Sequence, residues 1–99
     1  MGLVTSSSSP HIILSGEVDL SVAPGLEEAG TEMARSVAPG ILEIDLGDVT
    51  FIDSSGLGAL ISLRNASREC GADVVLLRVS PVVTRFLELA GVRDSFKVR

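Results

Sequence analysis

The chain has 99 residues, enough for one domain, and with 45 % hydrophobic but only 3 % aromatic residues its core must be built from aliphatic side chains. The formal net charge is −5 and no basic stripe with interleaved aromatics is present, which argues against a nucleic-acid partner. The lone Cys70 excludes an internal disulfide and indicates a reducing cytoplasm, and no apolar run approaches the about 20 residues needed to span a bilayer.

Charge is divided unevenly along the chain. Residues 1–53 carry nine carboxylates and one cation, Arg35, whereas residues 54–99 carry four carboxylates and seven cations. The two parts therefore have net charges of −8 and +3, a pattern that either orients a protein partner or reflects ordinary solvated surface charge.

The first half of the chain predicts a strand and a helix. Residues 6–10 are a serine run ending in proline, typical of a flexible linker or turn, so ordered structure is expected to begin near His11. Residues 12–14 form a short apolar run, which predicts a buried strand. A helix should follow, with Ser21 as its N-cap and Gly40 as its stop. Its apolar residues recur at i, i+3, i+7 and i+11: Leu26, Ala29, Met33 and Val37.

The second half repeats this alternation. Residues 41–46 predict a strand, a loop is expected over residues 48–53, and a helix should run from Ser55 toward Cys70. Residues 74–77 predict a buried strand, the segment after Ser80-Pro81 a third helix, and residues 96–98 a last short strand. Because strands and helices alternate, the sequence predicts an α/β fold with a mainly parallel sheet.

Residues 45–58 lead from a strand through an acidic turn into a helix. Asp53, Ser54 and Ser55 stand where side chains that cap the free amides of a helix are favoured, and a helix N-terminus also binds phosphate. Gly56 and Gly58 each weaken a helix by about 1 kcal/mol. Capping explains the acid and the serines but not the glycines, which favour the close approach of another molecule.

Three blocks of this sequence resemble the bacterial STAS family, of the anti-sigma-factor antagonist type. Residues 51–58, Phe-Ile-Asp-Ser-Ser-Gly-Leu-Gly, resemble the family signature, residues 16–19 resemble its Gly-Glu-Leu-Asp turn, and residues 80–91 resemble its last conserved helix. The resemblance implies a small single-domain STAS fold over residues 11–99, a mainly parallel mixed sheet with helices packed on it. Residues 1–10 would then be a flexible segment or a reduced first strand at residues 3–5.

The resemblance also implies a phosphorylatable binding module. Ser54 occupies the position of the phosphorylated serine, and the implied partners are an anti-sigma factor that is also a serine kinase and an opposing phosphatase. The unphosphorylated protein would bind the anti-sigma factor and release a sigma factor. No cofactor or metal is implied. The residues expected to bind the partner are Asp19, Asp53, Ser54, Ser55, Gly56, Leu57 and Gly58.

Three further expectations concern this site. Asp19 should lie close to Ser54, because both follow neighbouring parallel strands at one edge of the sheet. Ser54, rather than Ser55, should accept phosphate because an N-cap residue presents its hydroxyl outward. A set of large apolar residues should divide between the core and a shallow surface beside Ser54: Leu57, Leu60, Ile61 and Leu63.

Two alternatives remain open at this point. The chain could be a STAS interaction module cut from a larger protein, such as the cytosolic domain of an anion transporter or a stress-signalling assembly. It could instead be an enzyme with Ser54 or Ser55 as nucleophile, but His11 is the only histidine that could serve as a base, and neither a Gly-x-Ser-x-Gly elbow nor a phosphate-binding loop is present. Enzyme activity is therefore not expected.

Overall fold

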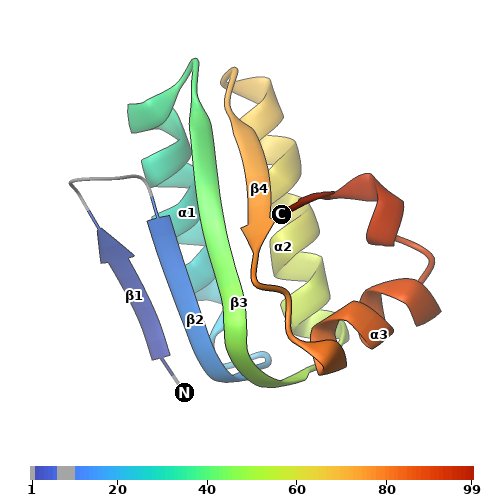
Figure 1. Cartoon of the computed structure of the whole chain (residues 1–99). Helices are drawn as coiled ribbons and strands as arrows, with labels where there is room; N and C mark the ends of the chain where they lie inside the picture. The colour runs from blue at the N-terminus through green and yellow to red at the C-terminus, as the bar shows by residue number, and fades with distance from the viewer. Residues whose placement is uncertain (1, 7–10) are drawn as a thin grey trace.

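The computed structural model describes residues 2–6 and 11–99. Five strands form one sheet in the order of the chain, with β1 antiparallel to β2 and the other four strands parallel (Figure 1). The strands are β1 (Gly2–Ser6), β2 (His11–Val18), β3 (Ile41–Ile52), β4 (Asp73–Leu77) and β5 (Lys97–Val98). The helices are α1 (Ala23–Val37), α2 (Ser54–Glu69), α3 (Pro81–Leu89) and the short 3-10 helix η1 (Arg93–Ser95). The predicted α/β fold is confirmed.

β1 covers the residues at which a reduced first strand was expected. It pairs with β2 from Gly2 opposite Ser15 to Ser6 opposite His11. Most of the predicted linker, residues 7–10, lies outside the described residues.

The core lies between one face of the sheet and the two longer helices. α1 and α2 lie side by side behind the sheet in Figure 1. They approach closely because Gly30 of α1 has no side chain: a Cβ there would lie 2.5 Å from Leu63 Cδ2. Alternate residues of the strands are buried on this face: Ile12, Leu14, Leu42, Ile44, Leu46, Val74 and Leu76.

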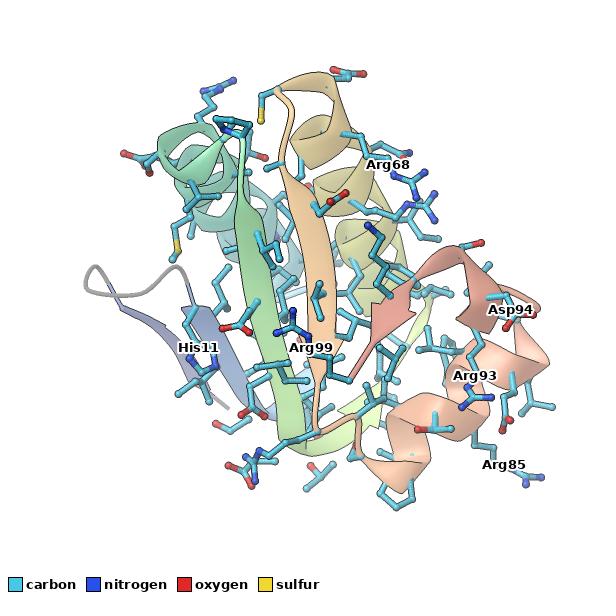
Figure 2. All side chains as sticks on the ribbon, turned by 45° about the horizontal axis from the view of Figure 1, so that its top comes forward. His11, Arg68, Arg85, Arg93, Asp94 and Arg99 are labelled. Carbon is cyan, nitrogen blue, oxygen red and sulfur yellow. The ribbon has the colours of Figure 1, made fainter. Side chains whose placement is uncertain are left out.

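Among the described residues, no helix covers the opposite face of the sheet. This face carries ion pairs between its strands. Arg99 Nη1 lies 2.9 Å from Glu43 Oε2, and Lys97 Nζ lies 3.2 Å from Asp73 Oδ2. Figure 2 shows Arg99 and His11 on this face, while Arg68, Arg85 and Arg93 lie on α2, α3 and η1 to one side. Arg68, Arg85 and Arg93 therefore lie apart from Lys97 and Arg99, which pair with carboxylates on the sheet face (Figure 2).

β3 is longer than predicted, and the expected loop over residues 48–53 is wrong. The strand continues to Ile52 because β2 pairs with it as far as Val18 opposite Ile52, with register shifts that absorb the irregular turn-like sequence around Gly47. β4 pairs with β3 only over residues 41–45. Residues 46–52, the projecting half of β3, therefore extend beyond β4.

α3 lies beside the projecting half of β3, in the place that a longer β4 would occupy (Figure 1). The Ser80 hydroxyl, at the start of α3, donates to the Val49 carbonyl over 2.9 Å. Val83 and Leu87 are buried on the inner side of the helix. α3 thus supports the segment of β3 that leads into α2.

The predicted ends of α1 need correction. Its N-cap is Val22, not Ser21, because the Ser21 hydroxyl donates instead to Asp19 Oδ1 over 2.6 Å. The helix ends at Val37, before Gly40, since Pro39 cannot continue a helix. No helix among the described residues is both long and apolar enough to cross a membrane.

Candidate functional site

The turn after β2 and the start of α2 lie together at one edge of the sheet. Val18 and Ile52 are paired at the carboxyl ends of β2 and β3, and the Asp53 amide donates to the Val18 carbonyl over 3.4 Å. Asp19 follows Val18 and Ser54 follows Asp53. The structure therefore brings together the two segments that the sequence placed at the site, where open α/β sheets usually bind ligands.

Asp53, not Ser54, is the N-cap of α2. Its backbone is extended and its Oδ1 accepts a hydrogen bond from the Gly56 amide at 3.0 Å. The expectation that Ser54 occupies the cap position is wrong, because the carboxylate makes the stronger, charge-assisted bond to this amide. Ser54 is the first residue of the helix and is exposed, whereas Ser55 is half-buried. The more reachable hydroxyl is still that of Ser54.

The two glycines of α2 have different surroundings. Gly56 is buried, and a Cβ there would collide with the Val18 carbonyl and lie 2.9 Å from Val18 Cγ1. Gly58 is exposed, and a Cβ there would meet nothing within 4 Å. The interpretation that both glycines admit another molecule is wrong for Gly56, whose missing side chain lets α2 pack on the end of β2.

Asp19 builds the turn that leads from β2 into α1. Its Oδ1 accepts hydrogen bonds from the Ser21 hydroxyl at 2.6 Å and the Ser21 amide at 3.0 Å, and its carbonyl accepts from the amides of Val22 and Ala23. The bonds from Ser21 hold the pKa of the Asp19 carboxyl below its ordinary value. A carboxylate that is ionised at neutral pH therefore lies beside the segment that carries Ser54.

The four apolar residues predicted to divide between the core and a surface do so only in part. Leu57, Leu60 and Leu63 are buried, and Ile61 packs partly buried against the same core. Helix α2 turns these side chains toward the sheet and α1, because both cover its inner side.

The exposed apolar side chains at this end of the sheet belong to two other residues. Leu20, in the turn after Asp19, is 71 % exposed, and Phe51, which pairs with Glu17 at the end of β3, is 47 % exposed. Neither residue was among the predicted site residues. If the strand had been extended to Ile52, the alternation of strand side chains would have predicted an exposed Phe51 beside a buried Ile52.

The single histidine of the sequence lies far from this edge. His11 begins β2, so it lies about 23 Å from Val18 at the usual rise of a strand. In the part of the chain that the structure describes, no group of three or more His, Cys, Asp or Glu residues is placed to hold a metal ion. The edge thus presents an exposed serine, two acids and two exposed apolar side chains.

Comparison with known proteins agrees with this geometry. The family model described as "Mlab, STAS domain" matches residues 1–98. The anti-sigma-B factor antagonist of Listeria monocytogenes is 31 % identical over 88 residues, which cover 89 % of this chain and 76 % of that protein.

Solved structures give the same result. An anti-sigma factor antagonist from Mycobacterium paratuberculosis is 29 % identical with a TM-score of 0.73, covering 98 % of this chain and 83 % of that one. The unphosphorylated form of the anti-sigma factor antagonist SpoIIAA has a TM-score of 0.81 at 18 % identity, covering 99 % of this chain and 88 % of that one, so its likeness is one of fold.

The chain is thus a small α/β domain whose candidate site lies at the carboxyl ends of β2 and β3. It belongs to the STAS domain family, and anti-sigma factor antagonists are among its homologues. These homologues are named as regulators and not as enzymes, in agreement with the sequence analysis.

Proposed function

We propose that this protein is an anti-sigma-factor antagonist of the bacterial cytoplasm that works by partner switching. In its unphosphorylated form it binds an anti-sigma factor that is also a serine kinase, and a sigma factor is released. Phosphorylation of Ser54 ends this binding, and an opposing phosphatase restores it. The observation that carries the proposal is that Ser54 is an exposed residue in the first turn of α2, at the edge where Asp53 bonds to Val18 and the Asp19 turn begins.

The charge of a phosphate is large enough to operate such a switch. A phosphoserine carries about −1.5 to −2 charges, and a kinase that has just transferred the group still holds nucleotide phosphates nearby. Like charges about 5 Å apart at an effective dielectric near 20 repel by roughly 3 kcal/mol, or about a hundredfold in affinity. The attraction of the α2 N-terminus for the phosphate, about 0.3 to 1 kcal/mol, does not offset this repulsion.

Ser54 is the acceptor in this proposal because its side chain is exposed, while that of Ser55 is half-buried. Asp53 occupies the cap, so modification of Ser54 leaves the hydrogen bond to Gly56 in place. The folded domain can then carry the phosphate without losing the start of α2.

A two-stage experiment tests the proposal. Immobilised Ser54→Ala and Ser54→Asp proteins are used to capture partners from the source cell, and captured proteins are identified by mass spectrometry. We expect an anti-sigma factor with a kinase domain on Ser54→Ala and a much weaker signal on Ser54→Asp. That partner, with ATP, should then phosphorylate wild-type protein and Ser55→Ala but not Ser54→Ala. Full modification of Ser54→Ala, with the phosphate mapped to Ser55, would overturn the assignment.

A further inference from the structure

Arg78, the residue that follows β4, has a left-handed backbone conformation. Its φ is 48°, and among the described residues it is the one non-glycine residue with a positive φ. A side chain in this region is strained, so the conformation persists only where surrounding contacts hold it. The backbone at Arg78 is therefore held by its surroundings, while the side chain is 61 % exposed.

The contacts that hold Arg78 come from β3. Arg78 Nε lies 2.9 Å from Asp45 Oδ2 and 3.2 Å from Asp45 Oδ1, and the Gly47 amide donates to Oδ1 over 2.9 Å. Arg78 Nη2 lies 3.7 Å from Asp48 Oδ2. The Asp45 side chain is only 11 % exposed. Its burial favours the protonated form, but the bonds from Arg78 and Gly47 outweigh burial and lower its pKa.

Gly47 leaves the space that the guanidinium fills. A Cβ at Gly47 would lie 2.6 Å from Arg78 Cζ and 2.7 Å from Arg78 Nη2. β3 is irregular at this point, because its pairing with β2 shifts register between Ile13 and Ser15. We call this set of contacts the Arg78 clamp; its residues are Arg78, Asp45, Gly47 and Asp48. The clamp thus lies at the irregular point of β3, where the projecting half of the strand begins.

The clamp lies at the point from which two segments run toward the candidate site. One is the projecting half of β3, which leads to Phe51 and Ser54. The other is the connection from Arg78 to α3, which is attached to the same strand by the bond from Ser80 to Val49 and presents the exposed Val82 in its first turn. Arg78 thus lies where the chain leaves β4 toward α3, and its side chain contacts β3 at the start of the projecting half.

We infer that Arg78 is a positioning residue for the partner-binding surface: by clamping Asp45 and Gly47 it fixes α3 against the strand that carries Phe51 and leads to Ser54. The role in partner binding rests on the proposed function, whereas the role of the clamp in fixing α3 on β3 does not. Arg78 itself need not contact the partner.

Two variants disturb the clamp by different means. Arg78→Gly removes the guanidinium but keeps a residue that adopts positive φ without strain. Gly47→Ala keeps the arginine but displaces its guanidinium. The matched control is Arg99→Gln, which removes the ion pair with Glu43 on the same sheet face, at the part of β3 that pairs with β4.

Hydrogen exchange tests the structural part without a partner. In both clamp variants we expect the amides of residues 48–53 to exchange at least tenfold faster than in wild type, with α1 and residues 41–44 unchanged. Arg99→Gln should leave residues 48–53 as protected as in wild type. Equal protection of residues 48–53 in wild type and both clamp variants would overturn the inference.

Binding tests the functional part, with the anti-sigma factor captured on Ser54→Ala as the probe. The clamp variants should bind it at least tenfold more weakly than wild type at a temperature where circular dichroism shows all proteins folded, and Arg99→Gln should bind normally. If either clamp variant fails to fold, Arg78→Lys, which keeps the charge but not the fork geometry, replaces it. Wild-type affinity in folded clamp variants would refute the inference, whereas failure of wild type itself to capture an anti-sigma factor would refute the proposed function instead.

Discussion

Gly56, in the first turn of α2, lies against the backbone carbonyl of Val18 at the end of β2. This contact joins the helix that begins with Ser54 to the strand that precedes Asp19. It also separates the roles of two glycines that look alike in the sequence, because Gly58 has open space around it.

Gly56→Ala should lower the free energy of unfolding by about 1 to 3 kcal/mol, since the new methyl group must displace backbone. Gly58→Ala should raise it by about 0.5 to 1 kcal/mol, the usual gain for alanine in a helix. Urea unfolding of the two variants beside wild type measures both changes. Gly56→Ala as stable as Gly58→Ala would contradict the close contact with Val18.

The cap of α2 gives a second stability prediction. Asp53→Ala should lower the free energy of unfolding by about 0.5 to 2 kcal/mol, because the Gly56 amide loses its acceptor. Asp53→Asn should stay close to wild type, since asparagine caps equally well. Ser54→Ala, at an exposed position outside the cap, should change stability by less than about 0.5 kcal/mol. If Ser54→Ala lowered the free energy of unfolding more than Asp53→Ala, Ser54 and not Asp53 would be the capping residue.

Leu20 should be a contact residue for the partner. Leu20→Ala is expected to weaken binding of the captured anti-sigma factor about tenfold or more, because burying an exposed leucine side chain against a partner contributes about 1.5 to 3 kcal/mol. Leu89, at the end of α3, is a matched control because it is 75 % exposed, close to the 71 % of Leu20. Leu89→Ala should bind normally, and both variants should keep wild-type stability within about 0.5 kcal/mol. Equal binding by the two variants would remove Leu20 from the interface.

The Asp45 carboxyl should contribute to the dependence of stability on pH. Its pKa is lowered in the folded state, since the hydrogen bonds from Arg78 and Gly47 outweigh its burial. The stabilisation is therefore fully present above the unfolded pKa of about 3.9 and is lost as the pH falls through the lower, folded pKa.

Asp45→Asn should accordingly be less stable than wild type at pH 7 by about 1 to 3 kcal/mol, the usual range for hydrogen bonds to a charged group. The difference between the two proteins should shrink as the pH falls from 5 to 2. Urea unfolding across this range provides the measurement. A difference that stays constant, or grows in acid, would show that the ionised form of Asp45 is not what stabilises the fold.

The order of the elements, and the meeting of the turn after β2 with the start of α2, could be predicted from the sequence. Apolar periodicity is local, so it identified the helices and the buried parts of the strands. The expectation that these two segments meet followed from one rule, that carboxyl ends of neighbouring parallel strands lie at one edge of a sheet.

Features that depend on long-range pairing could not be predicted in this way. Gly47 and Asp48 are typical of a turn, and the strand continues past them because Asp48 and Val49 pair with β2. Asp53, Ser54 and Ser55 are all good caps, and local propensity does not choose among them. The left-handed Arg78 has no sequence signal either, because it depends on the distant Asp45 and on the missing side chain of Gly47.

The short β4 has a consequence for how this domain could acquire new partners. Because β4 pairs only with residues 41–45, α3 is attached to the projecting half of β3 by the Ser80 bond and apolar packing, not by a ladder of strand hydrogen bonds. Exposed residues of α3, such as Val82 and Arg85, can therefore be exchanged during evolution without breaking any strand pairing. Recognition can diverge at one end of the molecule while the sheet and its two covering helices, which determine folding, are inherited unchanged.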